Sequence, residues 1–192
     1  MKFLKFLLCS LLTFPAVVFA DPIADLAKAK CMNCHNPDSS MARIEAQTPE
    51  FIYKTMVDYK NKVRKYDMMT KRVATLDEAT LRGLSLFFSK LPRSPAIRGD
   101  EALIAAGKAL YEQQIPGTGY RTCAECHGNF GEGGGFGSPL NARLAGQISE
   151  HTISMMGVYK AGTIPGQTDM TNVARKLTDA QVKALAEYIQ SL

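Results

Sequence analysis

The sequence predicts an all-α protein built from two tandem helical domains. Three observations predict this fold class: apolar residues recur with helical spacing, no alternating run of β-branched residues suggests a strand, and the second half of the chain repeats the first. Residues 41–47 align with residues 141–147 at an offset of 100, and residues 76–91 align with residues 177–192 at an offset of 101. Hydrophobic residues make up 46% of the chain and charged residues 21%, which excludes a disordered chain, a collagen-like repeat and a polytopic membrane protein.

The first twenty residues have the pattern of a secretory signal peptide. Lys2 and Lys5 form a charged start, an apolar core follows, and small residues precede a cleavage site after Ala20. An uncleaved membrane anchor is the alternative, but it needs about 20 apolar residues, and this run is shorter and contains Pro15. Cys9 lies too early for a lipoprotein signal. We therefore expect cleavage of residues 1–20, export of the chain, and no membrane span in the mature protein.

After cleavage, a proline-containing break after residue 91 divides the chain into two predicted domains. Domain 1 comprises residues 21–95 and domain 2 comprises residues 96–192. The predicted helices span residues 22–30, 49–60, 78–90, 101–113, 149–160 and 179–191. Asp77 and Thr178 are candidate N-caps for the last helix of each domain. A loop at residues 116–119 leads into the second of two cysteine motifs.

The four cysteines of the mature chain fall into two copies of one motif. These copies are Cys31-Met32-Asn33-Cys34-His35 and Cys123-Ala124-Glu125-Cys126-His127. Two disulfides would suit an exported protein but require no histidine, a thioredoxin-like pair needs a βαβ unit, and zinc needs four ligands per site. Covalent attachment of c-type haem explains the whole motif, because the two thiols add to the vinyl groups of one haem and the histidine becomes the proximal iron ligand. The sequence therefore predicts two covalently bound haems.

The repeat also indicates a second axial ligand for each iron. Met69 aligns with Met170, and each stands seven residues before a leucine at the start of the last helix. A thioether suits haem iron, and a His/Met pair raises the reduction potential relative to a bis-His pair. The predicted iron ligands are His35, Met69, His127 and Met170. Met68 is the nearest rival to Met69, whereas Met56 and Met156 lie within middle helices and fit core packing better.

The whole mature chain resembles the dihaem class I cytochromes c of the cytochrome c4 family. The resemblance rests on the two cysteine–histidine motifs, the segment Leu144-Ala145-Gly146-Gln147, the spacing from each predicted methionine ligand to the last helix, and the closing segment of residues 185–189. It implies two cytochrome c domains packed face to face and electron transfer in the bacterial periplasm, commonly toward a terminal oxidase. It implies no catalytic residues.

Three function classes remain open. A soluble electron shuttle is favoured because two His/Met sites close both irons to substrate. The second class is a dihaem peroxidase-like enzyme, which needs an open iron. The third is an electron-accepting subunit of a flavoprotein dehydrogenase of the sulfide-oxidising flavocytochrome type, which needs the same haem sites as the shuttle. The expected partners are redox proteins such as a cytochrome bc complex, a terminal oxidase or a dehydrogenase, with peripheral membrane association possible. A net charge of +5, or +3 without the leader's two lysines, argues against nucleic-acid binding.

The first half departs from the family pattern in three ways. Asn36 stands where Gly128 follows the second motif, the leading helix is shorter, and Ser39 occupies the position of Pro139. In the family, the counterpart of Pro139 offers its carbonyl to the proximal histidine ring, and such a bond tunes ligand basicity. We therefore expect the two haems to differ in reduction potential.

Charge also differs between the halves. Residues 21–95 contain 13 basic and 9 acidic residues, whereas residues 96–192 contain 8 and 9. Six basic residues flank the predicted Met69 loop: Lys60, Lys62, Arg64, Lys65, Lys71 and Arg72. They form either a solvated loop or a face that steers an acidic redox partner. His151 aligns with Phe51 and is expected on a helix face rather than at an iron.

Overall fold

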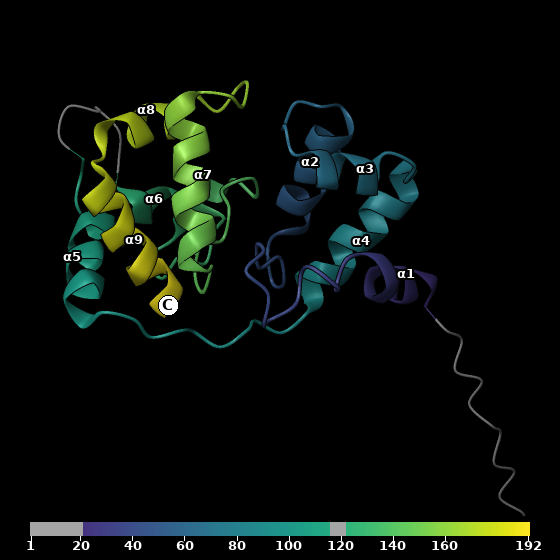
Figure 1. Cartoon of the computed structure of the whole chain (residues 1–192), viewed down its shortest axis with the longest axis horizontal. Helices are drawn as coiled ribbons and strands as arrows, with labels where there is room; N and C mark the ends of the chain where they lie inside the picture. The colour runs from purple at the N-terminus through teal and green to yellow at the C-terminus, as the bar shows by residue number, and fades with distance from the viewer. Residues whose placement is uncertain (1–20, 116–121) are drawn as a thin grey trace, which may run out of the picture.

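The computed structural model describes residues 21–115 and 122–192 (Figure 1). The predicted signal peptide and the predicted loop at residues 116–119 lie outside the described residues. The described chain is helical and contains no strand, which confirms the all-α prediction. Its helices are α1 (Pro22–Lys30), α2 (Pro49–Lys60), α3 (Asp67–Val73), α4 (Glu78–Lys90), α5 (Glu101–Glu112), α6 (Cys123–His127), α7 (Ser149–Ala161), α8 (Thr168–Lys176) and α9 (Asp179–Ser191), with a 3-10 turn, η1 (Gly135–Gly137). None of these helices combines the length and the apolar character needed to cross a bilayer.

Helices α1 to α4 pack around a first core. The residue before a helix accepts hydrogen bonds from backbone N–H groups of its first turn at three of these helices: Asp21 caps α1, Thr48 caps α2 and Asp77 caps α4. A proline follows Asp21 and Thr48, at the helix position where no N–H partner is lost. The buried side chains of this core are Ala27, Ile52, Met56, Val73, Leu81, Leu84 and Phe88. The predicted cap at Asp77 and the predicted core position of Met56 are confirmed.

Helices from α5 to α9 pack around a second core. Helices α5 and α9 approach closely at Gly107, where an added Cβ would lie 2.6 Å from the backbone carbon of Ala184, so this crossing requires a residue without a side chain. Thr178 caps α9 in a capping box with Gln181, which confirms the predicted cap. The buried side chains are Tyr111, Ile115, Leu177, Val182, Leu185 and Tyr188. Met156 packs against them, as expected from its position in the middle helix.

Three short helices, α3, α6 and α8, are absent from the sequence-based expectation. Helices α3 and α8 follow the middle helices of the two halves and contain Met69 and Met170. A signal for α8 exists, because Met170, Val173 and Leu177 recur at helical spacing. Helix α3 has only seven residues, and the stability of such short helices comes from packing.

The two groups of helices lie side by side, and the extended segment of residues 91–100 joins them along one edge of the molecule (Figure 1). Two equivalent pairs of residues hold the groups together. Gln47 donates a hydrogen bond to the carbonyl of Arg143 (2.9 Å) and accepts one from its N–H (2.7 Å). Gln147 makes the same two bonds to Arg43, at 2.9 and 3.0 Å. Because these residues are related by the offset of 100, the halves face each other as in a two-fold dimer.

Candidate functional site

All eight residues predicted to attach haem or to ligate iron line one internal cavity of about 1000 Å³. This cavity runs through both groups of helices, and its walls are mainly apolar. The eight residues are Cys31, Cys34, His35 and Met69 from the first half, and Cys123, Cys126, His127 and Met170 from the second. The fold therefore brings both motifs and both methionines to a shared interior space.

Local backbone structure presents each motif as one helical turn. The second motif forms α6, whose first turn is held by a capping box between Thr122 and Glu125. The first motif continues from the end of α1 as a turn in which the N–H groups of Cys34 and His35 donate to the carbonyl of Cys31, at 3.1 and 2.9 Å. Residues three apart on a helical turn lie on the same face. Both thiols of a motif therefore point to one side, with the histidine beside the second thiol.

One hydrogen bond to a backbone carbonyl orients each motif histidine. The Nδ1 of His35 lies 2.8 Å from the carbonyl oxygen of Ala42, and the Nδ1 of His127 lies 2.7 Å from that of Ala142. A bond of this kind places the ring proton on Nδ1 and leaves Nε2 as the metal ligand. Burial lowers the pKa of His127, which favours the neutral ring that metal binding requires.

This geometry corrects the expectation based on Ser39 and Pro139. The carbonyl of Pro139 accepts a hydrogen bond from the Thr48 hydroxyl. The Ser39 hydroxyl donates a hydrogen bond to the carbonyl of Cys34. The acceptors for the histidine rings are the carbonyls of Ala42 and Ala142, which are related by the repeat offset of 100. Because these acceptors are main-chain atoms, they are the same in both halves. The replacement of proline by serine therefore gives no reason for the two haems to differ in potential.

Burial keeps two of the motif thiols protonated. It raises the pKa of Cys31, against the opposing positive charges of Arg72 and Lys30. It raises the pKa of Cys123 to about 11. Reactive and redox cysteines sit in electropositive sites that lower the thiol pKa. The Cys123 thiol has the opposite character, which fits an attachment residue better than a redox pair.

The two candidate methionines of the first half differ in exposure. Met69 is partly buried and packs against the first core, whereas Met68 is 47% exposed. Both border the cavity, but adjacent residues on a helix point in different directions. Met69 is therefore the better placed of the two, as the repeat predicts.

Three arginines bring buried Nε atoms without a hydrogen bond to the cavity wall. The Nε atoms of Arg43, Arg64 and Arg143 are buried and make no hydrogen bond within the described residues, and all three side chains line the cavity. Buried donors without an acceptor are costly, and haem carries two carboxylates. The apolar walls, the paired thiols, the available ring nitrogens and these cationic donors therefore fit two haems. The repeat of Arg43 at Arg143 was a sequence signal for two of these arginines, whereas Arg64 has no counterpart in the second half.

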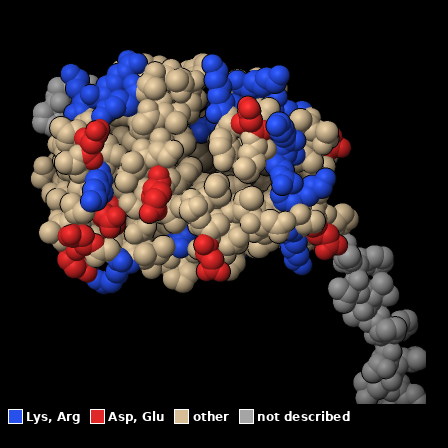
Figure 2. Space-filling model, viewed as in Figure 1, with Lys and Arg blue, Asp and Glu red and all other residues tan. Residues whose placement is uncertain are grey.

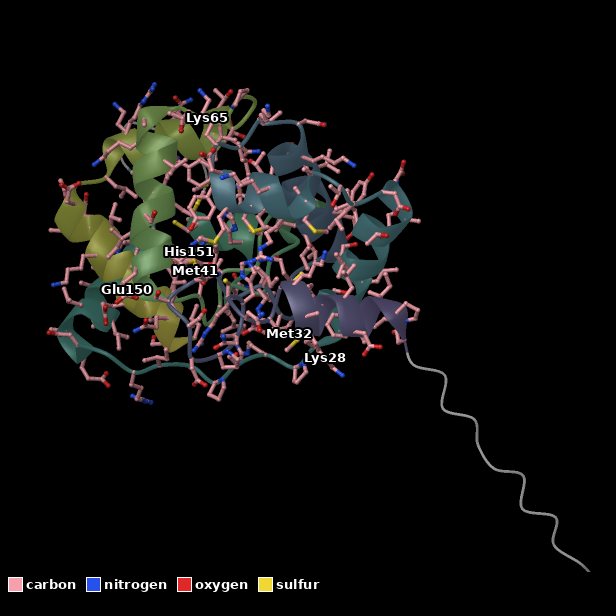
Figure 3. The ribbon with its side chains drawn as sticks, turned by 45° about the vertical axis from the view of Figure 1, so that its right-hand side comes forward. Lys28, Met32, Met41, Lys65, Glu150 and His151 are labelled. Atoms are coloured by element: carbon pink, nitrogen blue, oxygen red, sulfur yellow. The ribbon has the colours of Figure 1, made fainter. Side chains whose placement is uncertain are left out.

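His151 lies on the face of α7 that borders the cavity, which agrees with the expectation of a helix-face residue. Figure 3 shows it in the interior, where the two groups of helices meet. Burial lowers its pKa to about 4, and the positive charge of Arg64 acts in the same direction. His151 is therefore neutral at physiological pH.

We expect this histidine to weaken the protein in acid. At pH values between about 6.5, its ordinary pKa, and about 4, its pKa in the folded protein, His151 is protonated in the unfolded chain and neutral in the folded chain. The free energy of unfolding therefore falls as the pH drops from about 6.5 to about 4, by at most about 3 kcal/mol. The variant His151→Phe, which copies its repeat partner Phe51, should lose less stability than the parent between pH 7.5 and pH 4.5 in denaturant titrations. Equal losses in the two proteins would contradict the assignment.

Known proteins are similar to this chain in sequence and in fold. The Cytochrome c family model matches residues 104–192. A cytochrome c4 from Thiocapsa roseopersicina is 30% identical over 183 residues, which cover 90% of this chain and 93% of the relative. The crystal structure of reduced recombinant cytochrome c4 from Pseudomonas stutzeri gives a TM-score of 0.78 at 26% identity and covers 91% of this chain and 100% of that chain. A protein of Stutzerimonas stutzeri named thiosulfate dehydrogenase electron acceptor is 25% identical over 185 residues, or 88% of this chain and 82% of the relative.

Proposed function

This chain belongs to the cytochrome c4 family of dihaem electron-transfer proteins, and we propose that it carries electrons between redox proteins in the periplasm, toward a terminal oxidase. Its family relation gives it two covalently bound c-type haems. When bound, each haem supplies a reversible one-electron change at iron. The observation that carries the proposal is the single cavity lined by two complete cysteine–histidine motifs and two repeat-related methionines.

The proposal gives the eight cavity residues two kinds of role. The cysteines would attach the haems, and the histidines and methionines would bind the irons. The first haem is assigned to Cys31, Cys34, His35 and Met69, and the second to Cys123, Cys126, His127 and Met170. Irons held by both a histidine and a methionine would have no position left for a substrate, which supports a carrier rather than an enzyme. His/Met ligation also supports reduction potentials above those of bis-His sites.

The proposal includes the division of the chain into domains and its export. Residues 21–95 and residues 96–192 each have their own buried core and their own motif, which supports two cytochrome c domains. The hydrogen bonds of Gln47 and Gln147 connect these domains through their cavity-lining segments. The signal-peptide pattern of residues 1–20 supports secretion to the periplasm.

A second candidate function is the electron acceptor of one particular dehydrogenase. Relatives from Stutzerimonas stutzeri and Thiomonas intermedia are named thiosulfate dehydrogenase electron acceptor, at 25% and 27% identity. A permanent subunit of a flavoprotein dehydrogenase is another form of the same function. These candidates use the same haem sites as a mobile carrier, and co-purification with a dehydrogenase distinguishes them from it.

The near-red charge-transfer band between methionine sulfur and ferric iron tests the proposed ligands. We expect the oxidised protein to show the intensity of two His/Met haems per chain. Met69→Ala and Met170→Ala should each remove half of the band and lower one of the two reduction potentials, because the thioether ligand raises the potential.

Met68→Ala is the matched control, because it changes the adjacent residue of the same helix. It should leave both the band and the two potentials intact. Loss of half the band in this variant would transfer the ligand role to Met68. A parent protein with one band or none would leave an iron open and favour the peroxidase-like alternative.

A further inference from the structure

The two methionine-bearing loops of the repeat differ strongly in charge. Residues 60–72 contain six Lys or Arg residues and a single acidic residue, Asp67. The corresponding residues 160–173 contain Lys160 and Asp169 only. Both halves have the same cysteine–histidine motif and a repeat-related methionine, so the proposed haem ligands do not account for the extra basic residues of the first half.

The structure separates the surface charges of the first loop from its internal ones. Lys60 donates a hydrogen bond to the carbonyl of Leu76, and Arg64 is 7% exposed and lies beside Asp58. Neither belongs to an outer face, which narrows the set of six expected from the sequence. The exposed members, which we name the basic rim, are Lys62, Lys65, Lys71 and Arg72. Figure 2 shows Lys and Arg side chains gathered over the end of the molecule that carries α2 and α3.

An exposed apolar centre lies within the same segment. Tyr66 is 43% exposed and Met68 is 47% exposed, and they stand between basic-rim residues in the chain. Both also border the cavity that contains Met69. An apolar centre with a charged surround is the usual anatomy of a protein interface. Here that surface borders the cavity at the proposed first haem site.

We propose that the basic rim, with Tyr66 and Met68 at its centre, is the docking surface for an acidic redox protein, so that electrons are exchanged with this partner through the first half of the chain. This inference rests on the proposed electron-transfer function and adds the chemistry and the location of the partner. In each encounter, a docked donor loses one electron and this chain gains it. The complementary charge accelerates the encounter, and salt weakens the effect.

Stopped-flow reduction of the haem-loaded protein tests the proposal. The probe is a reduced acidic [2Fe–2S] ferredoxin of the plant type, whose potential of about −400 mV provides ample driving force. We expect the bimolecular rate constant to fall at least tenfold between ionic strengths of about 0.01 M and 0.15 M, as the screening length shortens from about 30 Å to about 8 Å. The rim variant Lys62→Glu/Lys65→Glu/Lys71→Glu should reduce the rate constant at low salt at least tenfold.

The matched control reverses three exposed lysines elsewhere: Lys28→Glu/Lys90→Glu/Lys183→Glu. Figure 3 shows Lys65 and Lys28 toward opposite edges of the molecule. The control has the same net charge as the rim variant and should keep the rate constant within about threefold of the parent. An equal loss in both variants would mean that net charge acts without a local surface, and would overturn the proposal. A rate constant independent of salt in the parent would overturn it as well.

Two further readouts separate the remaining explanations. A neutral hydroquinone needs no charged docking surface, so it should reduce the parent and both variants equally. If it fails to reduce the parent, the proposed electron-transfer function is wrong. If it succeeds while the ferredoxin results fail, only the docking surface is wrong.

Vesicles of phosphatidylglycerol test a membrane role. Binding to them that the rim variant abolishes, with an unchanged ferredoxin rate constant, would assign the rim to a lipid surface and overturn the proposal.

Discussion

Replacing both cysteines of one motif is expected to remove one haem and to unfold the half of the molecule that held it. The two motifs share a cavity of about 1000 Å³. At about 24 cal/mol per Å³ of cavity, leaving half of this volume dry would cost about 12 kcal/mol. A folded domain has only about 5–15 kcal/mol of stability in total. The variant Cys123→Ala/Cys126→Ala should therefore lose the second core together with its haem.

Mass spectrometry and far-UV circular dichroism measure this result. The mass should fall by one haem, beyond the small change from the two substitutions, and the helical signal of the second half should be lost. The variant Cys31→Ala/Cys34→Ala is the matched control and should lose the other haem while the second half keeps its fold. A chain that retains two haems after loss of one motif would contradict the assignment of the cysteines.

Replacing the two interface glutamines is expected to uncouple the halves. Gln47 is buried, and its amide satisfies both the N–H and the carbonyl of Arg143; Gln147 does the same for Arg43. Leucine has a similar size but no polar atoms, so each substitution removes the partner of two backbone groups of the opposite half. It also removes the acceptor for the N–H of the next residue, Thr48 or Ile148. Each unpaired buried group costs about 1–3 kcal/mol. The double variant Gln47→Leu/Gln147→Leu should therefore lose several kcal/mol of coupling between the halves.

Differential scanning calorimetry should detect the uncoupling as two separate unfolding transitions in place of one. The haem content and the near-red band should stay unchanged, because neither glutamine is a proposed ligand. Gln114→Leu, which changes an exposed glutamine near the end of α5, is the control and should leave the unfolding profile unaltered. An unchanged profile in the double variant would show that other contacts hold the halves together.

The sequence alone was sufficient for the helices longer than nine residues and for the chemistry of the motifs. The spacing of two thiols and a following histidine can be read directly from the order of residues in the chain. The caps at Asp77 and Thr178 act on backbone groups within one helical turn. Such features depend on neighbours in sequence. The sequence did not predict the short helices α3 and α8, because contacts with the cores stabilise their few residues more than their own pattern does.

Only the tertiary structure decided which distant groups meet. It showed that Ala42 and Ala142 orient the histidines, so Pro139 does not. It also showed that Arg64 is buried although Lys62 and Lys65 are exposed. It also paired the glutamines with arginines of the opposite half. Backbone carbonyls are present at every residue, and arginine occurs both inside and outside proteins. Residue type therefore does not identify such partners, because packing between segments about 100 residues apart selects them.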